Sequence, residues 1–476
     1  MPASSEQRLL AALQAHAHAP ENVDRLVEIC NALIHVRRNE QMLPWADKGL
    51  ALEPTHCGLL YARAHALRLL GRHAEAAASW RAHRSLAWPP LYCETRLGRD
   101  LYLSGEIASA IELLSEAVRT AGDSEERDAQ KARKWLAEAL LATGDPAGFT
   151  HWLARNRGDS GSYRYAEAPM WNGQRDLRGE RVLVTHQMGY GDQFLLYASL
   201  RHWLDAGATV MFTCDPPIHG LLQASWPDCT VVPTERPLAV ATTLPPEALA
   251  AARAFAPTLQ ATLLHLPLLT QHDSTPPTPF FPAYLRAPED ARARAATWAQ
   301  ALRARRPGKR LAGLFWDCAQ HRVASNGSKE RCWAGLRSVP LAQIERLTLD
   351  PALAREVEFV SLHHPAAEMQ SGTPRGAISH YGPGIATFAD TAACLEQLDA
   401  VISVDAALAN LGAMSGKPTA VLANPTGEWR WGHAATSGAR SPWMTGVTVL
   451  RQTEMGDWRD VISQATGWLL APGPGA

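Results

Sequence analysis

The chain has 476 residues, of which 46% are hydrophobic and 20% are charged, a balance typical of soluble globular proteins. Its 46 Lys and Arg residues nearly match its 47 Asp and Glu residues, so the formal net charge is −1. Without a basic excess, the composition argues against a protein that binds nucleic acid or an anionic membrane surface. At roughly 150 residues per domain, the length predicts about three domains.

The N-terminus carries no sign of export. The stretch MPASSEQRLLAALQAHAHAPENVD is amphipathic and lacks the apolar centre of a signal peptide. No run of about 18 apolar residues is present, so we expect no membrane span. These features favour a cytoplasmic location.

Residues 1–157 are expected to be helical and contain an internal repeat. Gly71 and Gly105 lie 34 residues apart, and a weaker copy places Arg37 another 34 residues upstream. A fourth copy has Gly144 39 residues after Gly105, which indicates a longer preceding loop. An alanine and a bulky apolar residue keep the spacing of 34 after each of the first two glycines (Ala76 and Ala110, Trp80 and Leu114).

This pattern resembles the tetratricopeptide repeat, a helix–turn–helix unit of 34 residues, over about residues 22–155. Stacked repeats of this type bury a shared core and leave a concave groove. The resemblance implies either a groove that binds a peptide or protein, or an arm that serves as a scaffold or dimerisation element. Self-association of the chain therefore stays open.

After a polar linker at 158–178, the pattern changes to short apolar strands that alternate with helices. Within 179–300, strands are predicted at Arg181–His186, Thr209–Cys214 and Cys229–Pro233. A glycine-rich turn that runs into a helix is predicted at Gly189–Gly207, and a second helix at 217–225. Such alternation with short connections is typical of a parallel sheet covered on both faces.

A second alternating region is predicted within 301–476, after a connecting helix at Asp290–Arg305. The predicted strands are Arg310–Trp316, Val357–His364, Asp399–Asp405, Thr419–Asn424 and Val447–Gln452, and the predicted helices are Leu341–Leu347, Thr391–Leu398 and Ala406–Ser415. Two doubly wound units in tandem place ligands between the carboxyl ends of their strands. The predicted fold class is α + α/β: an α-solenoid followed by two Rossmann-like domains, the outline of the GT-B fold.

Three segments carry a more specific resemblance. They are HQMGYGDQFLLYASL (His186 to Leu200), GLFWD with the later RSVPL (Arg337 to Leu341), and FADTAACLEQLDAVISVDAALANLGAMSGKP (Phe388 to Pro418). Downstream, EWRWG, SPW and LRQ follow in the same order. Together they resemble the heptosyltransferase-like glycosyltransferases that carry tetratricopeptide repeats, over about residues 180–460. The resemblance implies a GT-B enzyme that uses a nucleotide sugar.

Asp192 is the candidate catalytic residue. It follows Gly189 and Gly191, which let the backbone turn after a strand and approach a ligand without a Cβ in the way. The resemblance implies that Asp192 is the base of an inverting transfer, and a carboxylate with an ordinary pKa near 4 is ionised at neutral pH. The alternative is that Asp192 only caps the following helix.

The candidate donor site begins at Asp405, where a predicted strand passes into a helix of small residues. A helix N-terminus suits a diphosphate, and Ala406 and Ala407 would let it come close. The family pattern has Thr or Ser at the position of Ala406 and His at that of Asn410, so a hydroxyl donor is lost here, whereas Asn410 still carries an amide that donates hydrogen bonds. The alternative is an alanine-rich helix that simply packs on the sheet.

Basic residues are needed to offset the charge of the leaving nucleotide. The resemblance implies that Arg337 has this role. Arg322, Lys329 and Arg331 lie in the loop before it, which is either a phosphate-binding loop or a solvated surface loop.

Trp316, Trp429 and Trp431 are candidates to stack on a base or sugar, with core packing as the alternative. The resemblance places Asp390 and Thr391 near the nucleotide, with a helix cap as the alternative.

No D-x-D motif lies where it would bind a sugar nucleotide through a metal, so neither a metal nor another cofactor is expected. The sequence therefore predicts an inverting, metal-independent glycosyltransferase with a nucleotide-sugar donor. By analogy of layout alone, its acceptor is a protein such as flagellin, presented by the repeat arm. Two alternatives remain: a catalytically degenerate scaffold for protein interactions, and a transferase that modifies a lipopolysaccharide precursor.

Overall fold

A computed structural model describes residues 4–36, 38–84, 89–153, 161–237, 242–268, 280–318, 336–366, 372–376, 378–426, 428–433 and 439–472. The chain divides into two compact units. The first comprises Met1–Leu140, and the second comprises the described residues from Leu141 on.

The first unit is an array of helices in which successive helices pack against each other as far as residue 121. Its helices are α1 (Ser5–His18), α2 (Val23–Val36), α3 (Asn39–Leu52), α4 (Cys57–Leu69), α5 (His73–His83), α6 (Pro90–Ser104), α7 (Ile107–Ala121) and α8 (Arg127–Ala142), the last of which ends in the second unit. The predicted α-solenoid is confirmed.

The repeat spacing corresponds to helical hairpins. Gly71 and Gly105 separate α4 from α5 and α6 from α7, and both have the positive φ that glycine adopts without strain. A Cβ on Gly98 of α6 would lie 2.4 Å from Leu114 of α7, so the two helices touch where the side chain is smallest. The equivalent pair in the preceding hairpin is Ala64 and Trp80, and both are buried. Arg37, the turn position of the weaker copy, lies outside the described residues.

The second unit begins with the short helix α9 (Gly148–Trp152) and continues into a lobe built on a four-stranded parallel sheet. The strands are β2 (Arg181–Thr185), β3 (Thr209–Cys214), β4 (Thr230–Pro233) and β6 (Leu259–Thr262), in the order β4-β3-β2-β6. Strands β1 (Tyr163–Arg164) and β5 (Thr242–Thr243) pair separately. The helices are α10 (Tyr190–Leu196), α11 (Leu200–Asp205), α12 (His219–Ser225) and α13 (Pro246–Phe255).

The helix predicted at Gly189–Gly207 is divided in the structure. A turn of 3-10 helix at Tyr197–Ser199 separates α10 from α11. Tyr197 is fully buried there, and its hydroxyl donates a hydrogen bond to the carbonyl of Thr213. The other predicted elements of this lobe agree with the structure to within a few residues, but β6 was not predicted.

The C-terminal lobe follows helix α14 (Glu289–Arg305) and has a seven-stranded sheet in the order β12-β13-β11-β10-β7-β8-β9. Only β12 is antiparallel to its neighbour. The strands are β7 (Arg310–Phe315), β8 (Val357–Ser361), β9 (Ile378–His380), β10 (Ala400–Val404), β11 (Thr419–Ala423), β12 (Ala439–Arg440) and β13 (Val447–Arg451).

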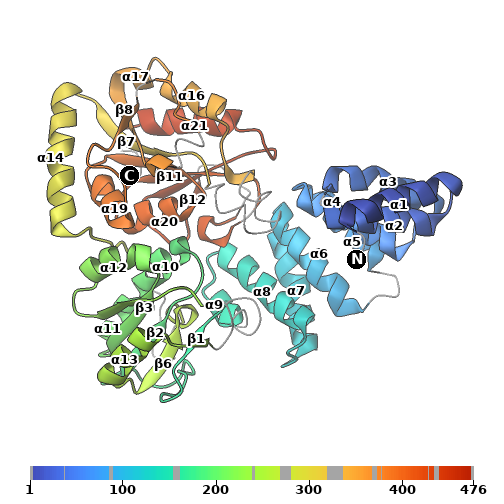
Figure 1. Cartoon of the computed structure of the whole chain (residues 1–476), viewed down its shortest axis with the longest axis horizontal. Coiled ribbons are helices and arrows are strands. Elements are labelled where there is room, and N and C mark those ends of the chain that lie inside the picture. Colours follow the sequence, from blue (N-terminus) through green and yellow to red (C-terminus); the bar gives the residue numbers. More distant parts are fainter. Residues whose placement is uncertain are drawn as a thin grey trace. The chain divides into compact units, whose positions relative to one another are not determined.

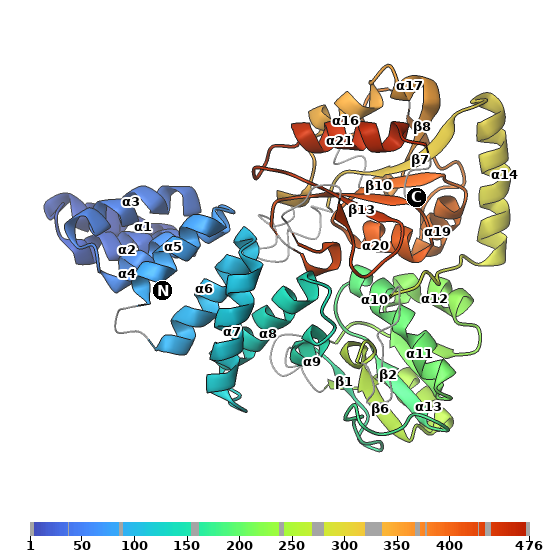
Figure 2. The same ribbon diagram turned by 180° about the vertical axis from the view of Figure 1, so that it is seen from behind.

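Helices cover both faces of this sheet. Helices α16 (Leu341–Thr348), α17 (Leu353–Glu356) and α21 (Arg459–Leu470) lie on one face, and α19 (Phe388–Glu396) and α20 (Ala407–Met414) lie on the other (Figures 1 and 2). The chain winds outward from β7 to β8 and β9, then returns to place β10, β11 and β13 on the other side. The prediction of two Rossmann-like domains is confirmed.

In such parallel sheets, ligands bind at the point where the strand order reverses direction. In the C-terminal lobe the reversal lies between β7 and β10, and in the preceding lobe between β2 and β6. Helices α10 and α20, which follow β2 and β10, lie side by side (Figures 1 and 2). In the described part of the chain, no helix combines the length and apolar character needed to cross a membrane.

Candidate active site

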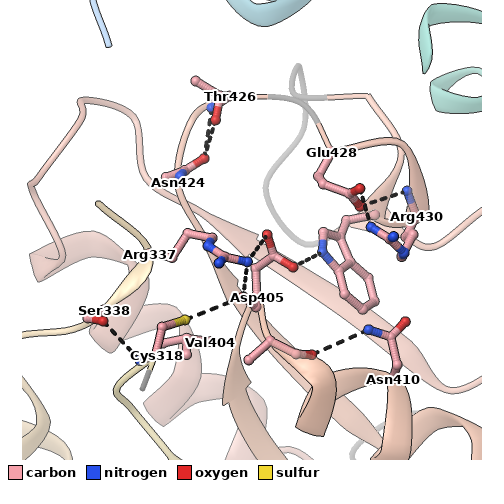
Figure 3. Close-up of polar contacts among 12 residues, drawn as sticks. Cys318, Arg337, Ser338, Val404, Asp405, Asn410, Asn424, Thr426, Glu428 and Arg430 are labelled. Carbon is pink, nitrogen blue, oxygen red and sulfur yellow. Dashed lines mark hydrogen bonds and ion pairs between the residues drawn. The ribbon is translucent and has the colours of Figure 1, made fainter. Parts of the chain in front are cut away.

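Asp405 lies at the carboxyl end of β10 and gathers contacts from three segments. Arg337 Nη1 donates to the Asp405 carbonyl over 2.9 Å and lies 3.6 Å from the carboxylate Oδ2. Trp431 Nε1 donates to the carboxylate Oδ1 over 2.9 Å, and the Cys318 thiol donates to the carbonyl over 3.7 Å. Figure 3 shows Arg337 and Cys318 pointing toward Asp405. The predicted site residues Arg337 and Asp405 are therefore together.

Two titratable side chains, Cys318 and Arg337, contact Asp405, and each has a shifted pKa. Burial raises the pKa of the Cys318 thiol to about 11, so Cys318 is protonated near neutral pH and is not a thiolate nucleophile. Burial acts to lower the pKa of Arg337, but the neighbouring charges, chiefly that of Asp405, together outweigh burial and leave that pKa above its ordinary value. Arg337 therefore remains a fixed positive charge at the carboxyl edge of the sheet.

Helix α20 begins directly after Asp405 with Ala406 as its N-cap, and no side chain caps it. Asn410 is 4% exposed and its Nδ2 donates to the Ala406 carbonyl over 3.3 Å. The Asn410 Oδ1 is buried and has no hydrogen-bond partner within the described ranges. The start of α20 thus presents backbone N–H groups beside small side chains, as a donor site at this position would require. One buried amide oxygen there is unsatisfied.

Asp192 lies in the first turn of α10, on the other lobe. Its Oδ2 accepts a hydrogen bond from the backbone N–H of Gly189 over 3.2 Å, which is the capping contact named as the alternative. Its Oδ1 pairs with Arg430 Nη2 of the C-terminal lobe. Both oxygens of the candidate base are therefore engaged in this structure, and its catalytic role stays a prediction.

The two glycines before Asp192 do not have the predicted turn geometry. Gly189 has ordinary extended angles, φ −77° and ψ 168°, whereas the left-handed residue is Met188, with φ 70°. Gly191 does allow a close approach, but to protein: a Cβ there would lie 2.9 Å from Asn410 Nδ2 and 3.2 Å from the Cα of Ala407. The starts of α10 and α20 therefore touch at Gly191.

Two further residues predicted to lie near the donor, Asp390 and Thr391, form hydrogen bonds within the cap of their own helix. Asp390 Oδ2 accepts hydrogen bonds from Thr387, which is the N-cap of α19, and Thr391 Oγ1 donates to the Thr387 carbonyl. The predicted start of this helix at Thr391 was late, since the helix begins at Phe388. Trp316 is 1% exposed and packs against His363 with ring centroids 4.0 Å apart and ring planes tilted by 50°, which is core packing. Contact of these residues with a donor stays a prediction.

The sequence did not point to Arg430, which joins the lobes through Asp192. Its motif EWRWG was recognised only by its order in the chain. Trp431 was proposed to stack on a ligand, but its ring is buried and its indole N–H holds Asp405. The basic residues Arg322, Lys329 and Arg331 lie outside the described residues.

A second polar cluster, also not predicted, lies at the carboxyl ends of β2 and β3. Asp215 pairs with Arg236 and accepts a hydrogen bond from Gln193 Nε2 over 2.7 Å, while His186 Nε2 lies 3.4 Å from its other oxygen. Burial acts to raise the pKa of Asp215, but the contacts with His186 and Arg236 outweigh it and hold that pKa below its ordinary value. Asp215 is thus a stable carboxylate in the N-terminal Rossmann-like lobe.

In the part of the chain that the structure describes, no three His, Cys, Asp or Glu residues form a group suited to a metal ion.

No protein-family model matches the sequence, and no curated protein matches it either. Solved structures do show similarity. A glycosyl transferase family 9 protein from Veillonella parvula DSM 2008 is 12% identical, with a TM-score of 0.40, over 59% of this chain and 88% of that chain. An O-GlcNAc transferase mutant of Thermobaculum terrenum is 17% identical, with a TM-score of 0.29, over 99% of this chain and 92% of that chain.

The tetratricopeptide protein YrrB, described as having an unusual peptide-binding site, is 19% identical, with a TM-score of 0.27, over 31% of this chain and 75% of that chain. The similar structures thus include two glycosyltransferases and a repeat protein, the two parts of the predicted layout. Their TM-scores are low, so no substrate or residue role is transferred from them to this chain.

Proposed function

We propose that this chain is an inverting, metal-independent glycosyltransferase of the cytoplasm that transfers a sugar from a nucleotide sugar to an acceptor hydroxyl. The observation that carries the proposal is the meeting of α10 and α20 at Gly191 and Ala407. It brings a carboxylate, Asp192, next to a helix N-terminus that suits phosphate. A base and a leaving-group site must be adjacent for such a transfer.

In the proposed reaction the donor phosphates lie at the start of α20, with Arg337 as an additional positive charge. The acceptor oxygen attacks the anomeric carbon from the face opposite the phosphate. The new carbon–oxygen bond forms as the bond to the phosphate oxygen breaks, and the nucleotide leaves with the bonding electrons. The acceptor proton passes to Asp192, the general base. Configuration at the anomeric carbon is inverted because one displacement occurs.

We propose further that the acceptor is a protein held by the repeat arm, and flagellin is the first candidate to test. A lipopolysaccharide precursor is the alternative acceptor, although a lipid needs no peptide groove. Candidate acceptors co-expressed with the chain should gain the mass of one or more sugars. That gain should be lost with Asp192→Asn, which removes the proton-accepting charge but keeps an oxygen for the Gly189 N–H.

A catalytically degenerate scaffold is the second candidate function. Two observations favour it: Ala406 supplies no side-chain cap to α20, and both oxygens of Asp192 are engaged. A panel of ADP, GDP, UDP, CDP, dTDP and CMP separates the two functions. A transferase should be stabilised selectively by one of them, by about 2.7 kcal/mol when the nucleotide is at 100 times its Kd. Uniform absence of stabilisation would favour the scaffold.

A further inference from the structure

Arg430 lies between two carboxylates that come from different lobes. Its Nη1 pairs with Glu428 Oε1, in its own segment, and its Nη2 pairs with Asp192 Oδ1, on α10. The Arg430 side chain is only 14% exposed, so these pairs are largely shielded from solvent. Figure 3 shows Glu428 and Arg430 facing each other. Arg430 thus connects the candidate base to the donor-side lobe.

The backbone around Arg430 is held on both sides. Trp429 is buried, and its carbonyl accepts a hydrogen bond from Trp443 Nε1 over 3.2 Å. Trp431 is anchored through its indole to Asp405, and the Arg430 carbonyl accepts a hydrogen bond from Ser441 Oγ over 2.7 Å. With its backbone fixed, Arg430 is left with its guanidinium as the part that can change partners.

The guanidinium is next to the proposed phosphate site. Asp192, its partner, directly follows Gly191, which touches Ala407 at the start of α20. A phosphate at this helix start would therefore lie beside the Arg430–Asp192 pair. A guanidinium fork binds a carboxylate or a phosphate with the same paired geometry, so the two anions are competing partners.

We propose that Arg430 is a donor-binding residue and that Asp192 occupies its place until the donor arrives. When the donor phosphate binds Arg430, the carboxylate of Asp192 is displaced from the guanidinium and becomes the free acceptor of the proton. Glu428 stays paired with the other side of Arg430 in both states and keeps it oriented. This inference rests on the proposed function and adds to it an exchange of anions that links donor binding to release of the base.

The test is a double-mutant cycle on nucleotide affinity, measured by calorimetry on the full chain with the tightest ligand among ADP, GDP, UDP, CDP, dTDP and CMP. Arg430→Ala should weaken nucleotide binding by about 10-fold or more. Arg430→Lys keeps the positive charge but not the guanidinium fork, so its affinity should lie between those of the wild type and Arg430→Ala. Asp192→Asn should tighten binding several-fold because the competing carboxylate is gone. In an Arg430→Ala background, Asp192→Asn should change affinity by less than about twofold.

The cycle separates competition from simple repulsion. If Asp192 merely repelled the phosphate, its removal would tighten binding equally without Arg430, and the proposal would be wrong. Unchanged affinity in Arg430→Ala would also overturn it. Arg375→Ala is the matched control, because Arg375 forms a paired contact with Glu345 on the exposed surface of the same lobe, and it should bind as the wild type does.

Two further outcomes are distinguishable. If none of the six nucleotides binds the wild type, the proposed function fails and this inference fails with it. If a nucleotide binds the wild type but its affinity changes with substitution of neither Arg430 nor Asp192, only this inference fails. Should Arg430→Ala not fold, as judged by circular dichroism, Arg430→Lys takes its place in the cycle. Arg430→Lys should weaken nucleotide binding, and Asp192→Asn should tighten binding less in that background than in the wild type.

Discussion

At the scale of single residues, Gly191 sets how closely the two lobes approach. Its missing Cβ leaves room for Asn410 and for the backbone of Ala407. Gly191→Ala should force α10 and α20 apart and destabilise the second unit by about 1–3 kcal/mol, the usual cost of overpacking. The measurement is urea-induced unfolding, together with nucleotide affinity, which should fall as well.

Gly220→Ala is the matched control for this change. Gly220 lies in helix α12 of the same lobe, and a Cβ there would meet nothing within 4 Å. Because alanine favours a helix over glycine by about 0.5–1 kcal/mol, this control should be neutral or stabilising. If Gly191→Ala behaved like Gly220→Ala, the close contact between α10 and α20 would not exist in solution.

Trp431 is the second residue whose role can be tested by a small change. Trp431→Phe keeps an aromatic ring but removes the indole N–H that holds Asp405 Oδ1. A buried acceptor that loses its donor costs about 1–3 kcal/mol, so unfolding should occur at lower urea. Trp468→Phe removes a similar contact, 3.2 Å to Thr448 Oγ1, at a partly exposed site and should have a smaller effect. Equal effects would contradict the assigned role of Trp431.

Motifs in the sequence identified some of the candidate site residues and missed others. Asp192, Arg337, Asp405 and Asn410 were identified from motifs and do lie near the facing helix starts. Arg430 could not be identified, because its partner Asp192 is 238 positions away in the chain and a single Arg in a loop has no pattern. A motif also does not show whether a side chain is buried. For this reason Trp316, which was a candidate to stack on a ligand, is found packed in the core.

At the scale of elements, the sheets were largely predictable and their edges were not. Central strands such as β3 and β10 are mostly apolar and almost entirely buried, as is typical of parallel strands covered on both faces. Strand β6 has the sequence LQAT, with little β propensity. Its place depends on tertiary contacts: the Gln260 amide bonds the backbone N–H and carbonyl of Tyr165 over 3.0 and 2.6 Å.

Helix α21 was missed for a different reason. Its buried residues Val461, Ile462, Ala465 and Leu469 recur with helical spacing, so the signal was present in the sequence. It follows the last predicted strand at a point where no motif was expected. No motif marks this helix, and only the periodicity of its apolar residues identifies it.

Helix α9 is short, but its aromatic contacts give it a large stabilising role. Phe149 is fully buried and its ring lies 5.2–6.0 Å from four other rings of the second unit (Phe280, Phe281, Trp429 and Trp443). Phe149→Ala should cost about 3–5 kcal/mol, the range for buried aromatic truncations. Chemical unfolding followed by tryptophan fluorescence measures the loss.

The control for Phe149 is Leu349→Ala, at a residue that is 48% exposed, where the change should stay within about 0.5 kcal/mol. Since Trp429 precedes Arg430, loosening α9 should also weaken nucleotide binding. Wild-type stability in Phe149→Ala would show that the aromatic cluster does not hold this segment.

At the scale of the whole molecule, the repeat pattern and the compact units divide the chain at different points. The helical repeats run to about residue 157 by sequence, whereas the second unit already begins at Leu141. The contacts explain the difference. Trp443 Nε1 donates to the Leu141 carbonyl over 3.0 Å, and α9 packs into the aromatic cluster of the second unit. The last repeat therefore contributes its second helix to the second unit.

This division predicts how fragments of the chain behave. A fragment of residues 141–476 keeps α9 and should unfold cooperatively, with nucleotide stabilisation retained. A fragment of residues 158–476 lacks Phe149 and Trp152, so the rings that pack on them become exposed to water. It should bind a hydrophobic dye and aggregate, as exposed apolar patches do. Dye fluorescence and size-exclusion chromatography compare the two. Identical behaviour would mean that α9 belongs with the repeat arm, because the rest of the second unit would then be complete without it.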